Sequence, residues 1–259
     1  MRKLFRYLIP LCSLGLILYS GWNLWAIHQE YKAGTDLYES VADTYTKPRI
    51  YGTRPDYAVE GEAYDGLPLQ VNFESLQTNN PDVVAWIYSP GTVINYPIVQ
   101  SGDNSYYLRR MLNGRYNKNG SIFMDYRNAS DLSDLHTIVY GHNMKNSAMF
   151  GTLTQYKDPA YYEQHPILWL LTPDGAYQIE LIGGFTTPSD SNIYVFPDTA
   201  KGRDRLVSFV QVNSDFTTDV EIGPDDRLVT LSTCTYDYDD ARYVVTGVLR
   251  PYIEENENE

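Results

Sequence analysis

Cysteine and histidine are both scarce in this sequence. Its 259 residues contain two cysteines, Cys12 and Cys234, and four histidines. No HExxH or CxxC pattern occurs, and scattered histidines do not have the ligand spacing of a zinc site. We therefore expect no metal, no cofactor and no intrachain disulfide.

Positive charge is scarce as well. The chain has 20 Lys+Arg against 33 Asp+Glu, a formal net charge of −13. Setting aside Arg2, Lys3 and Arg6, which precede an apolar stretch, leaves 17 against 33, a net charge of −16 for the rest of the chain. Such a surface repels phosphate backbones, so we expect no nucleic-acid partner.

One long apolar run stands near the start of the sequence, from about Tyr7 to Ile27. Its length is close to the roughly 20 residues that a helix needs to cross about 30 Å of hydrocarbon. Positive charges precede it, and no acidic residue occurs before Glu30. The pattern predicts a cytoplasmic N-terminus at 1–6, a single-pass membrane anchor at 7–27 and an extracellular remainder.

This apolar run has two alternative interpretations. A cleaved signal peptide is one, but the following SGWNLWAIHQ lacks a small-x-small cleavage site. A lipoprotein signal at Cys12 is the other, but Pro10 and Leu11 stand where small residues are expected. We interpret Cys12 as a buried cysteine of the span, which leaves Cys234 without an intrachain partner outside the membrane.

The rest of the chain divides into three regions. In residues 28–70 the sequence pattern predicts a helix at 28–47, followed by a linker rich in Gly, Pro and acidic residues. Residues 71–253 predict a mainly β domain, a closed barrel of eight short strands with added helices. Residues 254–259 predict an acidic tail. The expected strands are VVAWIY, NYPIVQ, GSIFMD, TIVYG, ILWLL, YQIELIGGF, RLVTLST and RYVVTGVL, and the expected helices NFESLQTNNPD, FGTLTQY and GRDRLVSFVQV.

Cys234 ends the run RLVTLSTC, and a second strand begins at Arg242. If the two strands form a hairpin, Cys234 and Arg242 emerge at the same end of the sheet. Alternation places Ser232 on the face of Cys234 and Thr233 on the other, where we expect a structural role. Most free cysteines are small buried hydrophobes, but this one ends a strand beside a polar loop.

His142 occupies a similar position at the end of TIVYG. We expect structural roles for the other histidines. His136 precedes its strand, His165 stands before a proline, and His28 lies at the membrane edge. Calcium binding by Asp237, Asp239 and Asp240 is left open, although such a loop is usually only solvated.

These residues resemble a known family. TLSTC followed by an arginine, with a histidine in YGH about ninety residues earlier, resembles the TLxTC signature of the sortases. The runs NYPIVQSGDNSYYL, GSIFMDYRN, VYGHNM and MFGTLTQY are similar to class B, and the resemblance covers about residues 71–251.

The resemblance implies a membrane-anchored cysteine transpeptidase. It would cleave a C-terminal sorting motif of the NPxTx or SPxTG kind in secreted proteins, at threonine, and pass the acyl group to an amine of a cell-wall precursor of the lipid II type. By matching motifs, Cys234 would be the nucleophile, His142 the acid/base, and Arg242 the stabiliser of the oxyanion or bound motif.

Further residues are expected to bind the substrate. Ser232 is a candidate donor to the substrate backbone, with a plain β-strand serine as the alternative. Asn95 and Tyr140 lie in runs that resemble the groove walls of class B, and Ile193 and Tyr194 precede the long helix-containing loop.

Three rival functions remain open at this stage. A pilus-type polymerising sortase is one, and a cysteine endopeptidase that releases the acyl group to water is another. The third is a non-catalytic envelope binding module. The presence of all three expected catalytic residue types argues against it.

Overall fold

The computed structural model describes residues 2–49 and 66–253, so most of the expected linker and the acidic tail at 254–259 lie outside the described residues. Eight strands close into a barrel in the order β10-β8-β7-β3-β4-β5-β6-β9, as the sequence predicts. They are β3 (Val83–Tyr88), β4 (Asn95–Val99), β5 (Ile122–Met124), β6 (His136–Tyr140), β7 (Ile167–Thr172), β8 (Gly175–Pro188), β9 (Arg227–Cys234) and β10 (Ala241–Tyr252).

Two pairs of neighbouring strands in the barrel are parallel, β4 with β5 and β6 with β9. The ladder of β6 and β9 ends at Tyr140, which lies opposite Ser232. On the other side of β9, β10 pairs antiparallel, with Arg242 opposite Cys234. The last residues of β6 and β9 and the first residues of β10 therefore meet at one rim of the barrel.

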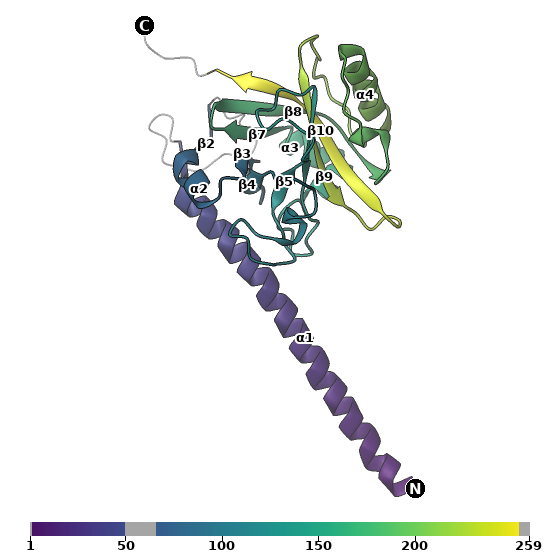
Figure 1. Ribbon diagram of the computed structural model, residues 1–259. Helices are drawn as coiled ribbons and strands as arrows, with labels where there is room; N and C mark the ends of the chain where they lie inside the picture. The colour runs from purple at the N-terminus through teal and green to yellow at the C-terminus, as the bar shows by residue number, and fades with distance from the viewer. Residues whose placement is uncertain (1, 50–65, 254–259) are drawn as a thin grey trace.

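Strand β9 separates two apolar clusters. Val229 and Leu231 face the larger core, whereas Leu228 belongs to a smaller cluster beneath α4 (Ala200–Asn213). Since side chains alternate along a strand, Ser232 and Cys234 share the face of Leu228. The cysteine side chain therefore lies on the same face of β9 as the cluster beneath α4. Figure 1 shows α4 on the outside of the barrel.

The shorter helices connect the strands. Asn72 caps α2 (Phe73–Asn79), because its side chain accepts from Ser75 N at 3.0 Å. The expected helix at 150–156 is instead a 3₁₀ turn, η2, followed by a short helix that begins with proline. The remaining elements are η1 (Tyr107–Arg109), η2 (Leu153–Lys157), α3 (Pro159–Gln164) and η3 (Asn192–Tyr194).

A single helix, α1 (Arg2–Tyr45), occupies the region where the sequence predicts a span and a separate helix. Among the described residues it is the helix long and apolar enough to cross a membrane, by length and composition. Its first half carries exposed apolar side chains, including Leu14, Ile17 and Trp22. After it, β1 (Thr46–Pro48) pairs with β2 (Leu69–Val71), a small sheet that the sequence did not predict.

The second half of α1 packs on the barrel (Figure 1). Tyr38 is 3% exposed, and its hydroxyl lies 2.7 Å from Gly120 O and 2.8 Å from Ser121 Oγ. At Gly34 the helix comes so close to the barrel that an added Cβ would lie 2.3 Å from Nδ2 of Asn119. This half of α1 is therefore part of the folded domain.

Candidate active site

The three residues singled out by the sequence lie on neighbouring strands. Cys234 ends β9, the middle strand, and Arg242 is its register partner on β10. His142 follows β6, whose ladder with β9 runs to Tyr140 and Ser232. Continuing the parallel register by two residues places His142 at the level of Cys234. The fold thus brings together residues separated by about a hundred positions in the chain.

Two hydrogen bonds extend the contact between β6 and β9 to the end of the strands. Gly141 N donates to Ser232 O at 3.0 Å, and Thr233 Oγ1 donates to Gly141 O at 2.8 Å. Asn143 Nδ2 then donates to Cys234 O at 2.9 Å. Thr233 is 2% exposed and faces away from Cys234, which gives it the structural position expected from the sequence. These bonds fix the backbone on both sides of His142.

The His142 imidazole is partly buried, and its Nε2 lies 2.6 Å from the carbonyl oxygen of Leu108 in η1. A carbonyl only accepts, so Nε2 carries a proton and the lone pair of the neutral ring is on Nδ1. Burial lowers the pKa of His142; the Leu108 carbonyl opposes this shift and the nearby Arg109 charge adds to it. A lowered pKa favours the neutral ring, the form that acts as a base.

The Arg242 guanidinium is held by its own loop. Nη1 donates to the carbonyl oxygens of Asp240 and Ala241, each at 3.1 Å, and Nη2 donates to Asp240 Oδ1 at 3.3 Å. An arginine has five donors, so Nε–H and one Nη2–H are without a partner among the described residues. The side chain is 26% exposed. Arg242 therefore presents a fixed charge with donors available.

Ser232 contacts the loop between β8 and α4. The Tyr194 hydroxyl lies 2.8 Å from Ser232 Oγ, and Ser232 is 2% exposed. Burial is the main cause of the raised pKa of Tyr194, which therefore stays neutral and able to donate. Ile193 is fully buried in the cluster beneath α4 and fixes this turn against the barrel. Ser232 and Tyr194 thus form one polar contact beside Cys234.

The two other expected binding residues lie at the same rim. Tyr140 stacks on Tyr194, with ring centroids 6.3 Å apart and an interplanar angle of 19°. Asn95 begins β4, and its Oδ1 accepts from Trp86 Nε1 at 2.8 Å. Since β4 is two strands from β6 in the barrel order, Asn95 is farther from Cys234 than Tyr140 is.

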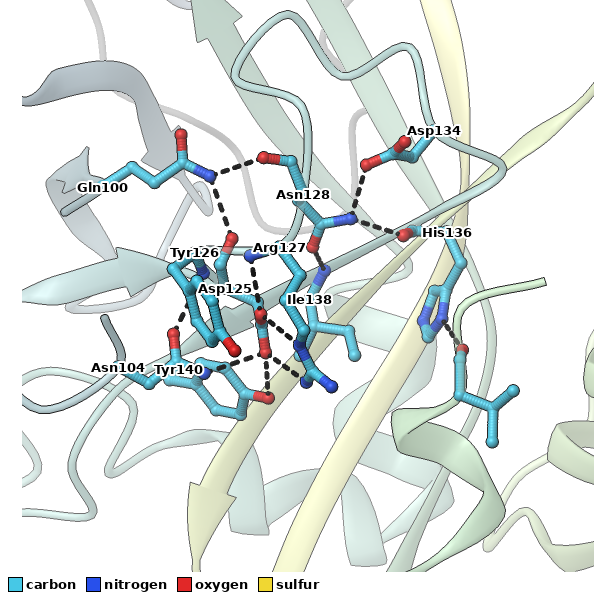
Figure 2. A network of polar contacts seen from close by, with 11 residues as sticks. Gln100, Asn104, Asp125, Tyr126, Arg127, Asn128, Asp134, His136, Ile138 and Tyr140 are labelled. Atoms are coloured by element: carbon cyan, nitrogen blue, oxygen red, sulfur yellow. Dashed lines mark hydrogen bonds and ion pairs between the residues drawn. The ribbon is translucent and has the colours of Figure 1, made fainter. Parts of the chain in front are cut away.

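A buried carboxylate accepts a hydrogen bond from the Tyr140 hydroxyl (Figure 2). Asp125 is 0% exposed; it accepts from the Tyr140 hydroxyl at 2.9 Å, from Asn104 Nδ2 at 2.9 Å and from two nitrogens of Arg127 at 2.7 and 2.8 Å. Burial alone would raise the pKa of Asp125, but these hydrogen bonds outweigh it and lower the pKa to about 2. The carboxylate is therefore ionised and fixes the position of the Tyr140 ring.

His136 also has a structural position, as expected, but it is the first residue of β6 rather than preceding it. It is 1% exposed, and its ring nitrogens contact Val195 O at 3.1 Å and Thr230 Oγ1 at 2.8 Å. Burial lowers the pKa of His136 to about 4, so the ring is neutral at neutral pH. The contact with Val195 holds the segment after Tyr194 against the barrel.

The acidic loop between β9 and β10 is tied to its neighbours. The Asp237 carboxylate accepts from Lys157 Nζ at 2.5 Å and from Thr235 Oγ1 at 2.7 Å. Over residues 2–49 and 66–253, no group of three or more His, Cys, Asp or Glu side chains is arranged to hold a metal ion.

Comparison with known proteins decides the family. Residues 87–250 match the family model described as Sortase domain. The chain is 35% identical over 246 residues to sortase B of Listeria monocytogenes, covering 93% of this chain and 95% of that protein. The chain is a class B sortase. It is thereby an enzyme of the cysteine transpeptidase type that acts in cell-wall anchoring.

Solved structures of class B sortases have the same fold as this sortase. A crystal structure of sortase B from B. anthracis in complex with AAEK1 has a TM-score of 0.72 and 30% identity, covering 87% of this chain and 100% of that chain. A Staphylococcus aureus sortase B–substrate complex has a TM-score of 0.66 and 32% identity, covering 70% of this chain and 85% of that chain. The predicted barrel is confirmed.

Sequence reasoning missed three parts of this site in the sortase. The Leu108 carbonyl that contacts His142 has no sequence signal, because a backbone atom of any residue can accept. Asn143 directly follows His142, but only the pairing of β6 with β9 brings its side chain to Cys234 O. Asp125 lies in the quoted run GSIFMDYRN, and its burial beneath Tyr140 follows from the barrel.

Proposed function

We propose that Cys234 is the nucleophile of this sortase, His142 the general acid/base, and Arg242 the donor that stabilises the oxyanion or the bound motif. One observation carries the assignment: Cys234 ends the middle one of three adjacent strands, with Arg242 opposite it and His142 at the end of the other neighbour. A nucleophile with a base and a cation on either side is the arrangement that acyl transfer requires.

In the first half of the reaction His142 takes the proton of the Cys234 thiol, and the sulfur attacks the threonine carbonyl carbon of the sorting motif. The peptide C–N bond breaks, the leaving amine takes a proton from His142, and the acyl group remains on sulfur as a thioester. In the second half His142 removes a proton from the incoming amine, which attacks the thioester carbonyl. Sulfur leaves as the thiolate and takes this proton back from His142, and one new amide bond replaces the one cleaved.

The contact with Leu108 supports Nδ1 as the atom of His142 that moves the protons. Because Nε2–H is engaged by the Leu108 carbonyl, Nδ1 is the nitrogen available to the thiol and to the two amines. A free thiol has a pKa of about 8.5 and is only a few per cent ionised at neutral pH, so a nearby base increases the reactive fraction.

Arg242 cannot be the base, because a guanidinium stays protonated over the working pH range. Its free Nε–H and Nη2–H suit the negative charge that develops on the carbonyl oxygen during attack. The bonds to Asp240 and Ala241 orient the guanidinium before the substrate arrives. This preorganisation is what makes such a donor effective.

The substrate is a secreted protein with a C-terminal motif of the NPxTx or SPxTG kind, and the acceptor is an amine of a cell-wall precursor of the lipid II type. The motif lies along the rim near Ser232, Tyr194 and Tyr140, with Asn95 contributing to the groove wall. Ile193, which is fully buried, supports the turn behind the groove and does not contact the motif. The S. aureus sortase B structure with a substrate supports a binding site on this fold. The hydroxyl groups of Tyr194 and Ser232, which bond to each other, are positioned to form hydrogen bonds with the motif backbone.

Residues 7–27 anchor the chain in the cell membrane as a single span, with residues 1–6 in the cytoplasm and the barrel outside the cell. The exposed apolar side chains of the first half of α1 and the basic residues before them support this topology.

A peptide library tests the substrate and the acceptor together. The full chain in detergent is incubated with threonine-containing pentapeptides, with and without an amine acceptor, and products are separated by mass. We expect cleavage after threonine and, with the acceptor present, a new amide to that amine. Strict hydrolysis despite abundant acceptor would contradict the transpeptidase proposal and indicate an endopeptidase; cleavage of no such peptide would contradict the motif. Joining of one substrate to the lysine of another would indicate a polymerising sortase.

A further inference from the structure

One segment of this acidic protein has only positive charge. Residues 105–118, here called the basic loop, contain Arg109, Arg110, Arg115 and Lys118 and no acidic residue. The chain outside the span and its flank has a net charge of −16, so this concentration is opposite in sign to the rest of the surface. A local basic patch attracts anionic partners even where the whole protein is acidic.

Three of these four cations form no ion pair with another residue that the structure describes. Among residues 2–49 and 66–253, no ion pair involves Arg109, Arg110 or Arg115, and all three are exposed. Arg110 lies over the ring of Tyr106, with Cζ 5.1 Å from the centroid. Arg109 Nη1 donates to the Tyr116 hydroxyl at 3.3 Å. The Arg109 and Arg110 guanidinium groups are therefore next to aromatic rings, and all three arginines are exposed to solvent. Arg110 Nη1 also donates to Gly114 O at 3.1 Å.

The basic loop also exposes apolar surface. Tyr106 is 45% exposed, Leu108 is 40% exposed and Tyr116 is 63% exposed. Tyrosine is enriched where proteins meet the membrane–water interface, since its ring and hydroxyl suit the two sides of that boundary. Arginine and tyrosine together on one exposed loop are the composition of a surface that binds headgroups.

Helix α1 sets the depth of the basic loop. Asn117 Nδ2 donates to Glu30 O at 2.9 Å, and Lys118 Nζ pairs with the Glu30 carboxylate at 2.9 Å. Glu30 is three residues beyond Ile27, which corresponds to about 4.5 Å along a helix. The polar layer of a bilayer is roughly 5–8 Å thick on each side. The basic loop is therefore attached to α1 at the level of the headgroups.

Aromatic residues on α1 give the same depth independently. Trp22 and Trp25 are 65% and 53% exposed and lie close together, with ring centroids 5.1 Å apart. Tryptophan concentrates at the interface, so these rings place the outer edge of the hydrocarbon near residues 22–27. Figure 1 shows α1 leaving the barrel beside the segment between β4 and β5, which includes the basic loop.

We propose that the basic loop binds the anionic headgroups of the bilayer that α1 enters. The inference rests on the proposed anchor, because α1 must be embedded for the loop to reach the headgroups. Arg109, Arg110 and Arg115 face the headgroup phosphates, and Tyr106 and Tyr116 enter the interface. The Leu108 carbonyl of this loop accepts from His142, so the contact places the catalytic rim next to the membrane surface.

Hydrogen–deuterium exchange on the full chain tests the proposal. The chain is placed in nanodiscs of phosphatidylcholine alone or mixed with phosphatidylglycerol, and exchange of amides in the basic loop is followed by mass spectrometry. We expect exchange in the anionic discs to be slower by on the order of fivefold, the effect of about one engaged cation. High salt should remove the difference, because it screens the charges.

Matched variants assign the effect to the loop. Arg110→Gln with Arg115→Gln should abolish the slowing, whereas Lys201→Gln with Arg205→Gln, which removes two exposed cations from α4, should leave it intact. Unchanged unfolding temperatures in both pairs exclude misfolding. Equal exchange in the two discs, or equal slowing in both variants, overturns the proposal.

Flotation with vesicles separates the two proposals. A chain that floats but whose basic loop exchanges equally in both discs contradicts only the headgroup contact. A chain that does not float contradicts the anchor and the headgroup contact together. Amide exchange in the basic loop that is slowed by soluble polyphosphate in detergent and not by the anionic discs would also overturn the proposal. That result would indicate that the loop binds a soluble polyanion.

Discussion

Replacing Arg242 with lysine tests whether the arginine acts by geometry or by charge alone. Its guanidinium donates to Asp240 O, Ala241 O and Asp240 Oδ1 at 3.1, 3.1 and 3.3 Å, which leaves Nε–H and one Nη2–H free. An ammonium has three donors, and the same three acceptors engage all of them. Arg242→Lys therefore keeps the charge and loses the free donors.

The expected loss is that of one oxyanion donor, on the order of 10²–10³ in kcat, or about 2.7–4 kcal/mol of transition-state stabilisation. The assay is transpeptidation of a threonine-containing peptide to an amine, from about pH 5 to 10, because the residual activity should keep the pH profile of the cysteine and histidine. Arg205→Lys, on the exposed face of α4, is the control. A rate near that of the wild type for Arg242→Lys would refute the geometric role.

Three further predictions follow from the contacts of His142, Asp125 and α1. His142→Ala should lower the rates of both acylation and deacylation by about 10²–10⁴-fold. The wild-type rate should decrease on the acid side at a pH below the ordinary histidine pKa of 6.5, and this acid limb should be absent in the variant. An acid limb retained in stopped-flow pH profiles of the variant would argue against this assignment. The pKa of Asp125 is lowered from 3.8 to about 2, so its contribution of about 2 kcal/mol is present above pH 3.8 and is lost as the pH falls toward 2. Asp125→Asn should therefore reduce the free energy of unfolding at pH 7 and flatten its acid dependence in urea titrations, and an unchanged dependence would contradict this. A chain beginning at His28 should unfold cooperatively like the full chain, whereas one beginning at Thr46, which lacks the buried Tyr38, should have a lower Tm; equal Tm values would show that α1 adds nothing to the domain.

The strands were predictable from the sequence because local patterns specify them. All eight expected runs are strands of the barrel, and the hairpin of β9 and β10 places Arg242 opposite Cys234 as expected. A period-two pattern bounded by turn residues carries this information within a few residues. The same local reasoning placed Thr233 away from Cys234.

The position of His142 was not predictable from local patterns. It depends on the parallel pairing of β6 with β9, which joins segments about ninety residues apart and has no turn sequence to indicate it. The Leu108 contact is likewise a tertiary contact between a side chain and a backbone atom. The sequence indicates His142 by its place at the end of a strand and by the family resemblance, and the pairing of β6 with β9 gives the physical reason for its position beside Cys234.

Helix α1 shows a different limit. The change from apolar to charged residues near His28 favoured two separate elements, yet the backbone continues as one helix to Tyr45. The composition of the helix changes near His28 because its surroundings change. The first half has exposed apolar side chains, whereas the second half packs on the barrel through Gly34 and Tyr38. The boundary at residue 27 remains a prediction about the membrane.

The most direct test of the account is to trap the acyl-enzyme. The full chain is mixed with a threonine-containing sorting peptide without acceptor, quenched in acid and digested, and the peptide that carries Cys234 is analysed by mass spectrometry. The account predicts a thioester on Cys234 that disappears when an amine is added before quenching, and no adduct in Cys234→Ala. An acyl group on another residue, or turnover retained in Cys234→Ala, would contradict it.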